Sequence, residues 1–203
     1  MQFLIVPGLG GSGPTHWQSL WERSYPGTRR LDQRDWDDPD RAAWIEQLSL
    51  AIDDAPGAIL IAHSLGCPLL AHLVERRPDI PVAGAMLVAP ADVDAEDCVE
   101  QLREFAPLPL ARLPFPSVVV ASSNDPYIGL ERARFFAKAW GARFVSAGPC
   151  RHINVAAGFG PWPAGEKILD ELVRQCRRPG DAHGTTLLQQ ADRSARHLGR
   201  TRA

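Results

Sequence analysis

Short runs of apolar residues alternate along this chain with longer stretches whose apolar positions recur at helical spacing. The short runs are apolar almost throughout, which is typical of parallel strands covered on both faces. This alternation predicts a three-layer α/β fold with a mainly parallel sheet of about six strands. The predicted strands cover 2–6, 28–31, 58–62, 82–88, 117–121 and 142–146, and the predicted helices cover 15–24, 40–54, 65–77, 94–105, 128–140 and 165–177.

Two segments interrupt this pattern. Residues 106–116 contain four prolines, which exclude a regular helix and predict an extended connection over one face. After about residue 179 the chain becomes rich in Arg, Gly, Gln and Thr. We therefore predict one domain over 1–178 and an Arg-rich tail over 179–203, which is either mobile or a short helix.

Composition and charge narrow the classes of function. Hydrophobic residues make up 45% of the chain, and its formal net charge of −2 offers no electrostatic case for nucleic acid or an anionic membrane. No apolar run approaches the roughly 18 residues of a membrane span, and Met1 leads directly into a predicted strand, so we expect a cytoplasmic protein. The four cysteines form no C-x-x-C pair, and we expect neither a metal nor a cofactor.

The most informative motif is Ala62-His63-Ser64-Leu65-Gly66, which lies between a predicted strand and a predicted helix. It matches the G-x-S-x-G nucleophile elbow with Ala in place of the first Gly. Such a turn holds the serine hydroxyl above the sheet, and the residues two positions away on either side must be small. The helix start also aims the Leu65 N–H at developing negative charge. The structural alternative is a serine that only caps a helix.

A nucleophilic serine needs a general base and an orienting acid, which in such folds follow it in the chain. Asp125 ends a buried strand, and His152 lies in a glycine- and proline-rich loop after the last strand. The two residues therefore stand in the expected order after Ser64. Asp92, which follows the strand 82–88, is the rival candidate for the acid and otherwise a candidate for the pocket wall.

Three other histidines compete less well for the role of base. We expect His63 to point away from the Ser64 side chain, because neighbouring side chains diverge. His16 precedes the expected position, and His72 lies on the predicted helix after the elbow, where a structural histidine fits better.

A glycine loop near the start of the chain has two interpretations. Gly8, Gly10 and Gly13 spell G-x-G-x-x-G after a strand, and Asp32 follows at a distance typical of a ribose-binding acid. A nucleotide-binding oxidoreductase is therefore one alternative. In that fold, however, the helix begins inside the glycine motif.

The residues after the loop favour the other interpretation. Pro14 and then Thr15, which we predict as the N-cap, indicate a helix that begins too late for a pyrophosphate site. A serine hydrolase needs a second oxyanion donor from an early glycine-rich loop. We predict the Leu9 N–H as that donor, beside the Leu65 N–H, with Gly8 close to the substrate.

Several stretches together resemble a known family. They are VPGLGGSGPTHWQSLWE, AHSLG, VAPADVD, SSNDPY and RHINVAAGFGPWPAGEKIL, within about residues 2–176. The chain resembles the small serine hydrolases of the α/β-hydrolase superfamily that include retinoblastoma-binding protein nine and its bacterial YdeN-type relatives. The resemblance implies an α/β-hydrolase fold without a large lid domain, a triad of Ser64, Asp125 and His152, and esters or small amides as substrates.

The sequence thus predicts a serine hydrolase that acts on a small-molecule ester or amide, with its oligomeric state left open. A non-catalytic binding module on the same fold is the second alternative. The retinoblastoma protein is not carried over as a partner, because residues 96–100 lack the Leu of an L-x-C-x-E motif. The candidates for substrate contact are Gly8, Trp17, Asp92, Phe159, Trp162 and the proline segment 106–116.

Overall fold

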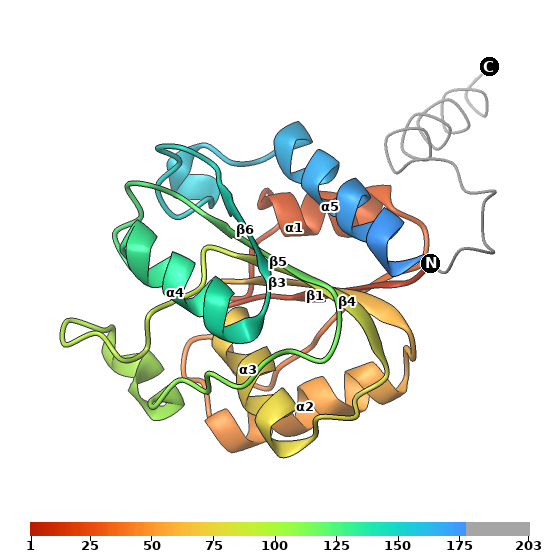
Figure 1. Ribbon diagram of the computed structural model, residues 1–203, viewed down its shortest axis with the longest axis horizontal. Helices are drawn as coiled ribbons and strands as arrows, with labels where there is room; N and C mark the ends of the chain where they lie inside the picture. Colours follow the sequence, from red (N-terminus) through yellow and green to blue (C-terminus); the bar gives the residue numbers. More distant parts are fainter. Residues whose placement is uncertain (178–203) are drawn as a thin grey trace.

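The computed structural model describes residues 1–177, so the predicted tail at 179–203 lies outside the described residues. Six parallel strands form one sheet in the order β2-β1-β3-β4-β5-β6 (Figure 1). The elements are β1 (Phe3–Val6), α1 (Trp17–Ser24), β2 (Thr28–Arg30), α2 (Arg41–Asp53), β3 (Ala58–His63), α3 (Gly66–Arg76), β4 (Val82–Val88), the 3-10 helix η1 (Glu100–Phe105), β5 (Ser117–Ala121), α4 (Leu130–Trp140), β6 (Arg143–Ser146), the 3-10 helix η2 (Val155–Ala157) and α5 (Pro163–Cys176).

The helices cover both faces of the sheet. On one face, α2, α3 and α4 pack through residues such as Trp44, Leu69 and Phe136. On the other face, α1 and α5 pack through Trp17 and Leu172 and lie side by side in Figure 1. The predicted three-layer α/β fold without a large lid domain is confirmed.

The strand order places the site. The chain runs outward from β1 to β2 and then crosses back to β3, so the order reverses between β1 and β3. Parallel sheets form a crevice at the carboxyl ends of the strands at such a reversal. The glycine loop after β1 and the Ser64 turn after β3 therefore lie next to each other.

One predicted helix is wrong. Only 100–105 of the predicted segment 94–105 is helical, and it is a 3-10 helix. The Asp92 carboxylate accepts the Asp94 N–H, and the Asp94 carboxylate accepts the Leu108 N–H. Aspartates that bond to nearby backbone in this way favour turns over helix.

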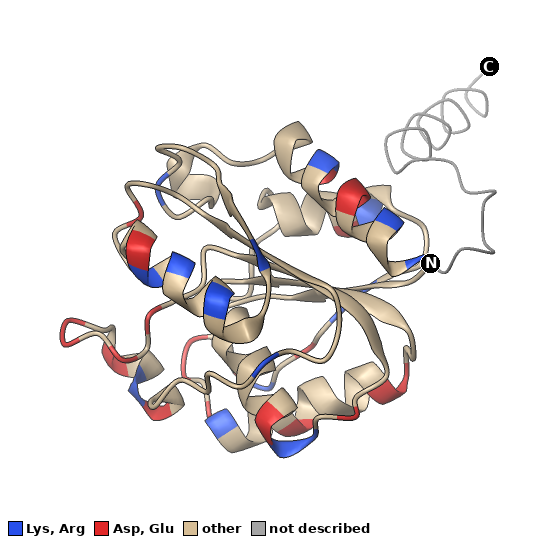
Figure 2. Cartoon of the chain, in the orientation of Figure 1, with Lys and Arg blue, Asp and Glu red and all other residues tan. Residues whose placement is uncertain are grey.

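Charged residues lie mainly on the outer helices and loops, whereas the sheet carries few of them (Figure 2). The strands β1, β3 and β5 are buried along their whole length. Within the described residues, no helix has the length and apolar character needed to cross a membrane. The four cysteines, all within this range, are free thiols.

Gly66, at the start of α3, has no room for a side chain. An added Cβ would collide with the Val6 carbonyl oxygen and lie 2.9 Å from that of Pro7. Both obstacles are backbone atoms, so relief requires a shift of β1 and its loop. We expect Gly66→Ala to lower the free energy of unfolding by about 1–3 kcal/mol in urea denaturation. Gly129→Ala, where an added Cβ meets nothing within 4 Å, is the matched control, and equal losses in the two variants would contradict this expectation.

Candidate active site

Ser64 stands on the turn between β3 and α3 in a left-handed backbone conformation, with a φ of 52°. Its N–H donates to the Val88 carbonyl oxygen at 3.0 Å, and its carbonyl oxygen accepts from Cys67 N–H at 3.0 Å. A serine rarely adopts such a φ, and strain of this kind persists only where the surroundings impose it. The turn therefore has the strained geometry of a nucleophile elbow.

The structure brings Ser64, His152 and Asp125 together. The Nε2 of His152 lies 2.9 Å from Ser64 Oγ, and its Nδ1 lies 3.0 Å from each carboxylate oxygen of Asp125. The Asp125 side chain is fully buried and can only accept, so the Nδ1 carries the proton. The Nε2 lone pair then accepts the Ser64 hydroxyl proton, which is the arrangement that activates a serine.

Two residues missed in the sequence hold the His152 loop against the end of β5. Ser122 is fully buried, and its Oγ accepts from Cys150 N–H at 2.8 Å. Asn124 Oδ1 accepts from Arg151 N–H at 2.6 Å. These bonds fix the spacing between the loop of His152 and the strand end that carries Asp125. Small polar residues after a strand are common, so no sequence pattern distinguishes this role.

The glycine loop packs directly against the elbow. An added Cβ on Gly8 would lie 2.9 Å from both Leu65 N and Ser64 Cβ. Within the described residues, neither Leu9 N–H nor Leu65 N–H donates a hydrogen bond. Leu65 directly follows Ser64 in the chain, and Leu9 lines the same cavity as Ser64.

The geometry of this loop disfavours the nucleotide alternative. Helix α1 begins at Trp17, well after Gly13, so its N-terminus lies outside the glycine motif. The N–H of Gly10 donates to the Trp36 carbonyl oxygen, and that of Gly11 to the Gly8 carbonyl oxygen. Both donors are therefore unavailable to a pyrophosphate.

Arg30 on β2 holds the glycine loop in place through hydrogen bonds. Its guanidinium donates to the carbonyl oxygens of Gly11 and Ser12 and is paired with Glu22 at 2.6 Å. The Arg30 guanidinium is therefore bound by the loop carbonyl oxygens and by Glu22, and it is not directed at a ligand.

A cavity of about 390 Å³ opens around Ser64. Its walls combine apolar residues from the segment after β4 with polar residues from the glycine loop and the His152 loop. The lining comprises Leu9, Gly10, Ser12, Gly13, His16, His63, Ser64, Ala91, Val99, Leu102, Tyr127, His152, Asn154, Val155 and Ala156.

The predicted aromatic wall is wrong. Trp17 and Trp162 are buried in the layer between the sheet and α5, with ring centroids 5.1 Å apart. Phe159 packs against the edge of the Trp162 ring. The proline segment 106–116 buries Leu108 and Leu113 in the opposite core rather than in the cavity.

Asp92 does not contact His152. Its carboxylate forms a bidentate pair with the Arg132 guanidinium at 2.9 and 3.2 Å. It lines a neighbouring cavity of about 190 Å³ rather than the one that holds Ser64. The predicted rival for the acid thus has a structural partner, which leaves Asp125 as the carboxylate on His152.

Two histidines lie where the sequence did not predict them. His63 does not point away from the site, because its ring centroid is 4.9 Å from that of His152 and its Nε2 contacts the His152 carbonyl oxygen at 3.0 Å. The His63 ring follows the alternation of β3, because Ile59 and Ile61 pack on the face covered by α1 and α5 and the His63 ring lies 5.9 Å from that of Trp17. The His152 loop packs on this same face through Ile153. His16, and not Thr15, is the N-cap of α1, with Nδ1 accepting from Gln18 N–H.

Burial keeps both of these rings neutral. Desolvation, followed by the charges of Arg30 and His152, lowers the pKa of His16 to about 4. Desolvation, followed by the neighbouring His152 and His16, lowers the pKa of His63 well below its usual range. His72 is different, since its Nε2 contacts the Phe105 carbonyl oxygen at 2.7 Å and ties α3 to η1.

The pKa of His16 leads to a prediction for stability against pH. Between about pH 6.5 and 4 the unfolded chain binds a proton at this residue that the folded chain excludes, so the free energy of unfolding falls as pH falls. His16→Asn keeps a capping oxygen for Gln18 N–H and removes the titration. In urea denaturation, we expect the decrease in the free energy of unfolding from about pH 6.5 to 4 to be about 3 kcal/mol smaller in His16→Asn than in the wild-type protein. The same pH dependence in both proteins would contradict this account.

Comparison with known proteins supports the same interpretation of the fold. The Serine hydrolase family model matches residues 3–171. No curated protein sequence matches this chain.

Several solved structures are similar to this chain. A YdeN-like hydrolase from Pectobacterium atrosepticum is 35% identical, with a TM-score of 0.77 over 87% of this chain and 92% of that one. The ydeN gene product of B. subtilis is 21% identical, with a TM-score of 0.72 over 85% and 98%. The esterase RhEst1 from a Rhodococcus species is 14% identical, with a TM-score of 0.62 over 87% and 90%. The last two show the likeness of fold alone.

Proposed function

Because this chain belongs to the serine hydrolase family, we propose that it cleaves carboxylic esters or small amides through an acyl-enzyme on Ser64. The observation that carries the proposal is the hydrogen-bonded series from Ser64 Oγ through His152 to Asp125. A serine hydroxyl is a weak nucleophile unless a base accepts its proton, and this series supplies the base in the required tautomer.

The first half of the reaction transfers the acyl group to the enzyme. Ser64 Oγ attacks the carbonyl carbon while His152 Nε2 takes the hydroxyl proton. The resulting oxyanion accepts hydrogen bonds from Leu9 N–H and Leu65 N–H, each of which typically contributes about 3 kcal/mol. The bond to the leaving group then breaks, and His152 returns the proton to the departing oxygen or nitrogen.

The second half releases the acid. Water attacks the acyl carbon while His152 Nε2 takes one of its protons, and Ser64 leaves with that proton. Asp125 keeps the Nδ1–H directed at itself and stabilises the imidazolium formed in each half. Every group needed for both halves comes from this chain.

Steady-state hydrolysis tests the proposal. We expect the wild-type protein to release p-nitrophenol from p-nitrophenyl butanoate, and Ser64→Ala to remain at the background rate. The matching p-nitroanilide separates ester from amide preference. Folded wild-type protein that cleaves neither compound faster than Ser64→Ala would leave the non-catalytic binding module as the better interpretation.

A further inference from the structure

The cavity around Ser64 is built without charged side chains. Within the described residues, its lining contains no Asp, Glu, Lys or Arg. One wall is apolar and is formed by Ala91, Val99 and Leu102. The facing wall is polar but uncharged, with Ser12 and Asn154 among its side chains.

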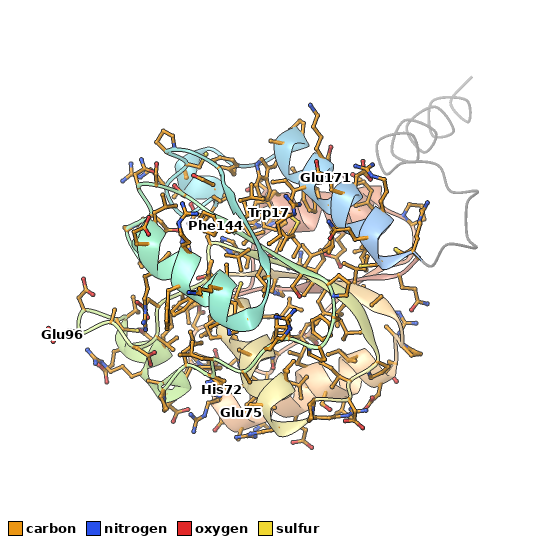
Figure 3. The ribbon with its side chains drawn as sticks, in the orientation of Figure 1. Trp17, His72, Glu75, Glu96, Phe144 and Glu171 are labelled. Carbon is orange, nitrogen blue, oxygen red and sulfur yellow. The ribbon has the colours of Figure 1, made fainter. Side chains whose placement is uncertain are left out.

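Three charged groups on the surrounding elements are directed away from the cavity. The Arg30 guanidinium lies behind the glycine loop on carbonyl oxygens and on Glu22. The carboxylate of Asp92 is paired with Arg132. Glu96, on the loop before η1, projects away from the body of the protein in Figure 3. None of these three groups lines the cavity around Ser64.

The histidines of the wall add no charge of their own. His16 caps α1 through Nδ1, and His63 lies against the His152 carbonyl oxygen. Both rings are buried, and their burial opposes protonation. A neutral wall also leaves His152 free of a cationic neighbour when it becomes an imidazolium.

The acyl group of the acyl-enzyme must occupy this cavity. It is bonded to Ser64 Oγ in the acyl-enzyme, and Ser64 is part of the lining. Every atom near the acyl carbon therefore lies against uncharged walls, whichever way the leaving group points. Leu9, Tyr127 and Val155 extend the apolar surface to the rim, where each is exposed.

We propose that the site selects uncharged acyl groups of short to medium length and discriminates against acyl groups with an ammonium or carboxylate next to the scissile carbonyl. This inference rests on the proposed function. A charge moved from water to such a wall loses its hydration and gains no partner, which is among the largest costs in recognition. The apolar wall stabilises an alkyl group in the same place.

Two isosteric esters test this selectivity. The p-nitrophenyl esters of 2-methylpropanoic acid and of L-alanine differ by one methyl group in place of one ammonium. We measure kcat/KM for both at about pH 6, where an α-ammonium is charged, and divide each by its rate of hydrolysis in hydroxide. We expect the uncharged ester to be preferred by about 100-fold or more.

A charged variant of the wall should reverse part of this preference. Val99 is only partly buried, so Val99→Glu has room to place a carboxylate in the cavity wall. We expect Val99→Glu to lower the ratio of kcat/KM for the 2-methylpropanoate ester to kcat/KM for the alanine ester by at least about tenfold. Val99→Gln supplies the uncharged isostere, and Leu110→Glu adds the same charge at an exposed leucine outside the lining. Leu110→Glu should keep the wild-type ratio, whereas Val99→Gln should narrow it by less than Val99→Glu, because it removes apolar surface without adding a charge.

The outcomes separate this inference from the proposed function. A wild-type enzyme that hydrolyses both esters through Ser64 but favours the alanine ester would overturn the inference and leave the function intact. Loss of that preference in Asp97→Asn would place the ammonium in the neighbouring acidic cavity, which shares Val99 and Leu102 with this one. Failure to hydrolyse either ester, with no reaction at Ser64 with a fluorophosphonate, would overturn both.

Discussion

Ser64→Ala is expected to lower kcat for a p-nitrophenyl ester by about a millionfold, to the background rate within error. Alanine leaves the proposed oxyanion donors and the cavity in place but removes the Ser64 oxygen, which lies 2.9 Å from His152 Nε2. Because the triad acts as a unit, the loss of its nucleophile costs nearly the whole of the chemical acceleration. Steady-state kinetics at saturating substrate measures the effect.

The stability of Ser64→Ala is the control for that loss. Alanine can keep the backbone bonds of residue 64 with Val88 and Cys67, which do not involve the hydroxyl. We therefore expect the free energy of unfolding to change by less than about 1 kcal/mol. Activity in folded Ser64→Ala above a tenth of the wild-type value would place the nucleophile elsewhere.

Asp125→Asn is expected to lower kcat by about ten-thousandfold with little change in KM. The amide can donate to His152 Nδ1 and so favours the tautomer with the proton on Nε2. In that tautomer the Nε2 can no longer accept the Ser64 proton. The fully buried position of the Asp125 side chain leaves no water to replace the lost acceptor.

Asp92→Asn is the matched control for that variant. It removes the same charge from another carboxylate near the site, which pairs with Arg132 rather than with His152. We expect its kcat to stay within about tenfold of the wild-type value. If kcat fell further in Asp92→Asn than in Asp125→Asn, Asp92 rather than Asp125 would be the carboxylate that orients His152.

The strands of the sheet could be predicted because the apolar pattern of each strand is contained in its own short segment of sequence. A parallel strand covered on both faces must be apolar along its length, so runs such as 58–62 and 117–121 identify strands without knowledge of their neighbours. The carboxyl ends of such strands meet at one edge. The proximity of Ser64, Asp125 and His152 follows from that rule and from their order in the chain.

The walls of the cavity depend on packing that no local pattern encodes. Trp17 is an aromatic residue next to a glycine-rich loop, but its ring turns into the layer beneath α5 (Figure 3). Val99 and Leu102 reach the cavity because aspartates turn the predicted helix 94–105 into loop and 3-10 helix. His63 meets His152 because the loop that carries His152 packs on the same face of the sheet, where Ile153 joins the core.

The central claim is that Ser64 is an activated nucleophile, and intact mass after treatment with a fluorophosphonate tests it most directly. The account predicts one phosphonyl adduct on the wild-type protein, formed with loss of fluoride, and none on folded Ser64→Ala. Folded wild-type protein that stays unlabelled, or equal labelling of the two proteins, would contradict it.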